Sequence, residues 1–138
     1  MRVLALLFLL GPIAEFGQID EGVVIVTHPD NVVESLSRRD LQRIYLNKKH
    51  HWPNGTRIIP TTVSEETLLA AFLHQFLSKT PAQYSTYWKR MIFSGRGTPP
   101  KTFETVEELR AFIQATPRAI GFVSADTDLE GLKVVCVE

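Results

Sequence analysis

Short apolar runs alternate along the chain with stretches in which apolar residues recur every three or four positions. The runs are rich in β-branched residues and predict buried strands at residues 23–26, 57–63, 119–123 and 132–137. The helical spacing between them predicts four helices, whose inward faces include Ile44, Phe72, Trp88 and Ile113 in turn. The resulting order is β-α-β-α-α-α-β-β.

This order predicts the fold class. Strands and helices that are mixed along the whole chain favour an α/β domain, with helices flanking a largely parallel sheet. In such folds ligands bind at the carboxyl ends of the strands, in the loops that lead into helices. The 138 residues suffice for one domain and not for two.

Capping residues stand where the helices are expected to begin. Ser37 is expected to cap the first helix, Ser64 the second, Thr80 the third and Thr105 the fourth. Glu108 completes a capping box with Thr105, whereas Thr67 occupies the position where a box after Ser64 would carry Glu or Gln.

Charge and residue types exclude several kinds of function. Fifteen Lys and Arg residues balance fifteen Asp and Glu residues, so no global positive field gathers nucleic acid or an anionic membrane, and any anion has to be bound locally. The single cysteine, Cys136, excludes an internal disulfide and a cysteine-based zinc site. Because no nucleophile–base pair or metal-ligand set can be assembled, we expect a non-enzymatic protein without metal or cofactor.

The N-terminal segment, residues 1–17, is typical of an export signal. Arg2 supplies a minimal positive region, residues 3–10 are apolar, and Gly11-Pro12 breaks the run. The run is short for a membrane span, which needs about 20 apolar residues. We therefore expect a periplasmic domain of residues 18–138 without a stable membrane span; an uncleaved anchor or an apolar strand is the alternative.

Two loops are candidates for an anion site. Residues 61–67 leave a strand and open a helix, where free backbone N–H groups and the helix dipole favour negative charge, and Thr62, Ser64 and Thr67 add hydroxyls. Glu65 and Glu66 already supply negative charge there, so binding and repulsion of phosphate remain equally open. In the second loop, Gly95-Arg96-Gly97, glycine is expected first to end a helix, and Arg96 second to reach an anion.

Three stretches, taken together, resemble phosphate-type periplasmic substrate-binding proteins and their short homologues. They are LSRRDLQRIYLNK with WPNG (residues 36–48 and 52–55), YWKRMIFSGRGTPP (87–100) and TPRAIGFV (116–123). The resemblance implies a single lobe of the type II periplasmic-binding-protein fold, non-catalytic and linked to phosphate uptake or sensing. Phosphate or a similar oxyanion would then be held by Thr62, Ser64 and Thr67, with Asn31 and Arg96 as helpers.

The chain departs from that pattern at three positions. Leu69 stands where the homologues usually carry an arginine, three residues before Phe72, and Asn47 and Arg118 each replace a glycine. A lost arginine contact removes about 1.5–3 kcal/mol per hydrogen bond. A lone lobe also lacks the second wall of a closed cleft, which a homodimer or an envelope protein partner would have to supply. The alternative hypothesis is therefore a ligand-free interaction or sensory module of the cell envelope.

Overall fold

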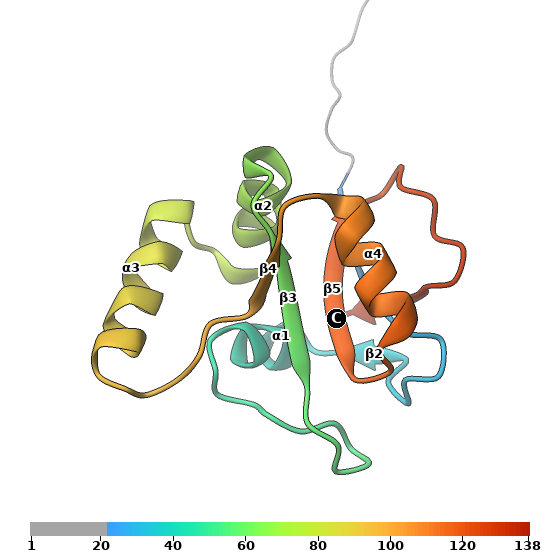
Figure 1. Cartoon of the computed structure of the whole chain (residues 1–138), viewed down its shortest axis with the longest axis horizontal. Helices are drawn as coiled ribbons and strands as arrows, with labels where there is room; N and C mark the ends of the chain where they lie inside the picture. The colour runs from blue at the N-terminus through green and yellow to red at the C-terminus, as the bar shows by residue number, and fades with distance from the viewer. Residues whose placement is uncertain (1–21) are drawn as a thin grey trace, which may run out of the picture.

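A computed structural model describes residues 22–138, and the expected export signal lies outside the described residues (Figure 1). Six strands form one sheet in the order β2-β6-β1-β5-β3-β4. The strands are β1 (Val23–Thr27), β2 (Ser35–Leu36), β3 (Ile59–Val63), β4 (Lys101–Phe103), β5 (Ala119–Ser124) and β6 (Lys133–Val137).

Strand direction divides the sheet into two unlike edges. β3 pairs in parallel with β4 and with β5, and β2 pairs in parallel with β6. β1 runs antiparallel to both of its neighbours, β5 and β6. Five strands therefore end at one edge, which we call the carboxyl edge, while β1 begins there and ends at the opposite edge. The expectation of an α/β fold with a mostly parallel sheet is confirmed.

All four expected helices are present: α1 (Arg38–Tyr45), α2 (Glu66–Phe72), α3 (Pro81–Phe93) and α4 (Val106–Ala115). After α2 the chain continues as a π-helical segment, η2 (Leu73–Leu77), which the apolar pattern does not distinguish from an ordinary helix. The short strands β2 and β4 were not expected, because two and three residues are too few to form an apolar run.

Aromatic packing joins α1 and α2 to one face of the sheet. The ring of Phe72 stacks on that of Phe122 with centroids 3.9 Å apart, and Tyr45 meets Phe72 edge-on at 4.8 Å. α4 covers the other face through Leu109 and Ile113, both fully buried. Gly121 permits this close approach, because a Cβ there would lie 2.7 Å from Ile113 Cδ1 and 2.5 Å from the Thr61 hydroxyl.

Three of the four expected caps are confirmed, and the fourth is wrong. Ser37, Thr80 and Thr105 each accept a backbone N–H with their side chain. α2 is capped by Glu65 and not by Ser64. Ser64 still belongs to the sheet, because its N–H donates to the Phe103 carbonyl at 2.9 Å, so the helix starts one residue later than expected.

The end of α3 explains the glycine-rich stretch. Gly95 has a φ of +70°, and its N–H donates to the Ile92 carbonyl at 3.1 Å. The next N–H, of Arg96, donates to the Met91 carbonyl at 2.9 Å, which completes a Schellman motif. The expectation that glycine ends this helix is confirmed.

Candidate functional site

The amino terminus of α2 is the part of the carboxyl edge where an anion was expected. There Glu65 Oε2 accepts the Thr67 N–H at 3.0 Å, and Glu65 Oε1 accepts the Leu68 N–H at 3.1 Å. Free N–H groups at a helix start are what attracts an anion. At α2 the carboxylate of the chain itself occupies two of them.

The hydroxyl residues of this loop lie together at the carboxyl edge. Thr62 is buried, and its Oγ1 lies 3.1 Å from Thr102 Oγ1 on the neighbouring strand. Ser64 and Thr67 are exposed. Leu69, at the position of the missing arginine, is half-buried and packs against the core. Two hydroxyls are thus accessible, and no cation accompanies them on α2.

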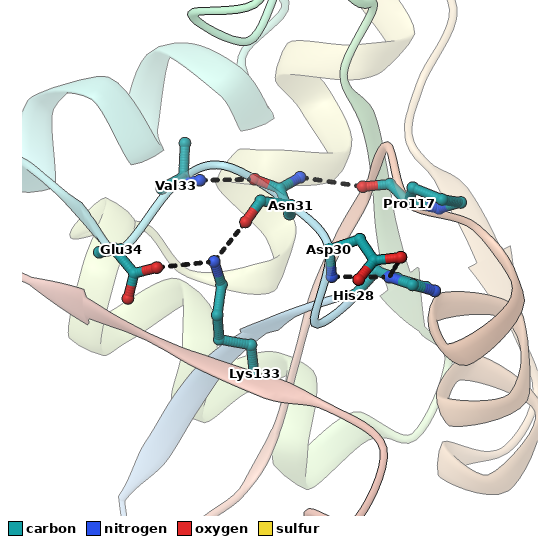
Figure 2. A network of polar contacts seen from close by, with 7 residues as sticks. All are labelled: His28, Asp30, Asn31, Val33, Glu34, Pro117 and Lys133. Atoms are coloured by element: carbon teal, nitrogen blue, oxygen red, sulfur yellow. Dashed lines mark hydrogen bonds and ion pairs between the residues drawn. The ribbon is translucent and has the colours of Figure 1, made fainter.

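Asn31 lies at the opposite edge of the sheet, because it follows β1, the one strand that runs the other way. Its side chain is engaged in the fold: Nδ2 donates to the Pro117 carbonyl at 3.0 Å, and Oδ1 accepts the Val33 N–H at 2.9 Å (Figure 2). Lys133 Nζ donates to the Asn31 carbonyl and to Glu34 Oε2, the latter at 3.2 Å. Asn31 ties together two loops and is separated from Thr62, Ser64 and Thr67 by the length of the sheet.

Arg96 also lies away from α2, in the turn that ends α3. Its Nε donates to Ser94 Oγ at 3.0 Å, and its carbonyl accepts Asn47 Nδ2 at 3.0 Å. Asn47 has a φ of +63°, a conformation that suits glycine and that asparagine tolerates best among the other residues. The departure from glycine at this position therefore keeps the backbone turn and adds a link to Arg96, which sequence reasoning missed.

The loops of the carboxyl edge are acidic. Residues 64–67 and 103–108, which follow β3 and β4, carry two and three carboxylates and no Lys or Arg. The segment after β5 adds Asp126, whose Oδ1 accepts the Ser124 hydroxyl at 2.6 Å. The same segment then leads away from this edge: Asp128 Oδ2 lies 3.9 Å from Nη2 of Arg110 on α4, and the Glu130 carbonyl accepts Gln114 Nε2 near the end of α4 at 2.9 Å. An anion approaching this edge meets carboxylates after each of the three strands.

The described part of the chain has open hollows beside α3. One, of about 250 Å³, lies between α3 and β4 and is lined mainly by apolar side chains, including Trp88, Ile92 and Pro100. Another, of about 500 Å³, lies between α3 and the segment after α1 and is lined by Asn47, Lys48, Tyr87 and Arg96, among others. Within residues 22–138 no three His, Cys, Asp or Glu side chains are placed to hold a metal ion, and no helix is long and apolar enough to cross a membrane.

Comparison with solved structures identifies the fold. A putative phosphate ABC transporter substrate-binding protein with bound phosphate from Clostridium perfringens superposes with a TM-score of 0.64 at 18% identity, covering 84% of this chain and 44% of that one. An ABC-type phosphate transport receptor from Vibrio cholerae gives 0.57 at 17% identity, with 84% and 46% covered. PstS from Borrelia burgdorferi gives 0.55 at 13% identity, with 85% and 47% covered.

These likenesses concern the fold, since the identities are low. The sequence matches no family model and no curated protein. The chain spans less than half the length of each of these three solved proteins. The architecture is therefore that of one lobe of a type II periplasmic binding protein.

Proposed function

We propose that this chain is a non-catalytic interaction or sensory module of the cell envelope, which keeps the binding-protein lobe but does not bind free phosphate by itself. The observation that carries the proposal is the Glu65 carboxylate on the Thr67 and Leu68 amides. A bound phosphate would have to displace this carboxylate from the helix start.

Electrostatics supports the same conclusion. The carboxylates of the three loops at the carboxyl edge repel an oxyanion, and Leu69 provides no compensating charge. An arginine at position 69 would contribute about 1.5–3 kcal/mol per hydrogen bond, which is roughly tenfold to a hundredfold in affinity. Of the two helper residues, Asn31 lies at the opposite edge of the sheet and Arg96 lies in the turn that ends α3, so neither lies beside the start of α2.

The second candidate is oxyanion binding linked to phosphate uptake or sensing. It is favoured by the likeness to a solved protein with bound phosphate and by the grouping of Thr62, Ser64 and Thr67 at one edge. This candidate requires a second wall from another copy or from a partner, because a single lobe cannot enclose an anion.

Titration calorimetry separates the two candidates. The purified protein is titrated with phosphate, with sulfate and with a neutral solute at constant ionic strength, and we expect no saturable heat at millimolar concentrations. Saturable heat with phosphate alone would overturn the proposal in favour of the second candidate.

The envelope role needs its own experiment. The protein is coupled to a resin and exposed to an envelope fraction with and without phosphate. The proposal expects one partner to be retained equally under both conditions. Retention that depends on phosphate, or no specific retention, would contradict it.

A further inference from the structure

The neutral net charge conceals a strong separation of charge along the chain. Residues 41–103 carry nine Lys and Arg residues and only two acidic residues, Glu65 and Glu66. The rest of the chain carries six Lys and Arg residues and thirteen acidic residues. Both acidic residues of the basic stretch lie at the start of α2, at the carboxyl edge. The basic side chains therefore gather on the other parts of that stretch.

Five of these cations lie on α3 and on the two loops at its carboxyl end. Together they form what we call the cationic face: Lys48, Lys49, Lys89, Arg90 and Arg96. The loops are joined by the hydrogen bond from Asn47 to Arg96, and Lys48 and Arg96 line the same hollow. Within residues 22–138 none of the five forms an ion pair. In Figure 1 this end of α3 and the connection from α1 to β3 lie at the lower side, away from the loops that follow β3 and β4 at the top.

An exposed aromatic residue, Phe93, ends α3 and stands between Arg90 and Arg96 along the chain. The side chain of Phe93 is 96% exposed, and that of its neighbour Ile92 is 55% exposed. On α3, Lys89 and Arg90 lie four and three residues before Phe93 and therefore on the same side of the helix. The opposite side of α3 is buried through Tyr84 and Trp88.

We propose that the cationic face binds the surface of a membrane rich in anionic phospholipids, with Phe93 inserted at the level of the headgroups. Cations near such a surface attract it, and an aromatic side chain among them adds burial of apolar area. Charge complementarity supports this occupant: no Asp or Glu occurs between residues 67 and 103, so nothing on α3 repels the anionic lipid.

The position of Phe93 favours a lipid surface over a protein partner. A protein partner binds an aromatic anchor in a pocket of its own or fills a groove beside it. Phe93 protrudes at the end of a helix and lines neither of the hollows beside α3. A lipid interface accepts such a side chain without a preformed pocket.

Co-sedimentation with vesicles tests the proposal. The protein is mixed at low ionic strength with vesicles of phosphatidylglycerol and phosphatidylcholine, and in parallel with vesicles of phosphatidylcholine alone. We expect binding to the anionic vesicles only, weakening as salt is added. Phe93→Ser should lower the partition coefficient about tenfold or more, and Arg90→Glu at least about fivefold.

Matched controls change similar residues outside the cationic face. Val32→Ser removes an apolar side chain that is 51% exposed, and Arg39→Glu reverses an exposed cation at the start of α1. Both should bind vesicles like the unchanged protein, and circular dichroism should show that all four variants are folded.

Three results would overturn the proposal. The first is equal binding to both kinds of vesicle, or none. The second is loss of binding when inorganic phosphate replaces chloride at the same ionic strength, which would mean a phosphate site and not a membrane surface. The third is self-association at low salt that Arg90→Glu abolishes while vesicle binding persists, which would mean that the face meets a second copy. None of these results depends on the outcome of calorimetry with phosphate.

Discussion

The carboxyl edge and the cationic face differ in whether their polar groups have partners within the fold. At the carboxyl edge the donors of α2 are bonded by Glu65 and those before α4 by Glu108, so the chain supplies its own anions. On the cationic face five Lys and Arg side chains have no acidic partner within the described residues, and Phe93 is left in solvent.

This difference shows where a partner is to be sought. In the binding-protein fold the carboxyl edge is the expected ligand site, but in this chain the Glu65 carboxylate already occupies two amides at the start of α2. The unsatisfied groups lie around α3. The net charge of zero is a sum over the whole chain and hides both the carboxylates of the carboxyl edge and the cations around α3.

The largest expected effect is the loss of a core aromatic residue, compared with the loss of an exposed residue on α3. Phe72 packs between Tyr45 and Phe122, so Phe72→Ala should lower the free energy of unfolding by about 3–5 kcal/mol through lost burial and a cavity. Urea denaturation measures the change. Ile92→Ala, on the exposed side of α3, should change the free energy of unfolding by no more than about 0.5 kcal/mol. Comparable losses in the two variants would show that Ile92 is part of the core.

Two glycines, one in the core beneath α4 and one at the end of α3, offer a sharper contrast. Gly121→Ala places a methyl group 2.5 Å from the Thr61 hydroxyl and should cost about 1–3 kcal/mol through overpacking. Gly95→Ala meets no atom within 4 Å, but its φ of +70° costs roughly 1 kcal/mol of strain. Thermal unfolding of both variants checks the order, and a larger loss at Gly95 would reverse our account of the close packing beneath α4.

Alkaline pH should lower the free energy of unfolding through two buried tyrosines that connect α3 to the core. Burial raises the pKa of Tyr45 and of Tyr84, whose hydroxyl donates to the Tyr45 carbonyl at 3.2 Å. In the unfolded chain both phenols ionise near pH ~10, whereas in the fold they stay neutral. The contribution of these two tyrosines to the free energy of unfolding is therefore constant below pH ~10. Above that pH the free energy of unfolding falls by up to about 1.4 kcal/mol per pH unit for each tyrosine.

A matched substitution isolates this alkaline effect. Tyr84→Phe lacks one ionisable phenol, so above pH ~10 its melting temperature should fall less steeply with pH than that of the unchanged protein. Melting curves recorded from neutral to alkaline pH measure the two slopes. Equal slopes would mean that Tyr84 ionises in the fold as readily as in the unfolded chain.

The smallest expected effect concerns the internal anion. Glu65→Ala frees the amides of Thr67 and Leu68 and should cost about 1 kcal/mol, as for other lost caps. Ser64→Ala removes no hydrogen bond of its side chain seen in the structure and should be neutral. Urea denaturation gives both values. If Ser64→Ala is the more costly variant, Ser64 and not Glu65 caps α2 in solution.

Much of the fold was predictable from sequence because its signals are local. Ser37, Thr80 and Thr105 cap helices through side chains only three residues from their targets, and Gly95 ends α3 by its own backbone freedom. The resemblance to binding proteins anticipated the single lobe. Ser64 misled because serine and glutamate can both cap, and the choice depended on pairing between Ser64 and Phe103 across the sheet.

The site was harder to predict because it depends on strand direction. The apolar run of β1 does not indicate whether the strand runs parallel or antiparallel to its neighbours. The sequence therefore could not predict that Asn31 lies at the edge opposite Thr62. Glu65 was seen as a possible competitor for the helix start, but only its hydrogen-bonded geometry reveals that it binds two amides. Overall composition does not reveal the cationic face, because acidic residues elsewhere in the chain offset its five cations.

The antiparallel pairing of β1 with β6 has a consequence for how this lobe can be built into larger proteins. The register that sets Ile25 opposite Val135 and Thr27 opposite Lys133, continued to the ends of both strands, places Gly22 beside Glu138. Entry and exit of the described polypeptide are therefore neighbours. The lobe could be inserted into a surface loop of a host protein, joined by two adjacent peptide connections, without disturbing the sheet of the lobe or the fold of the host.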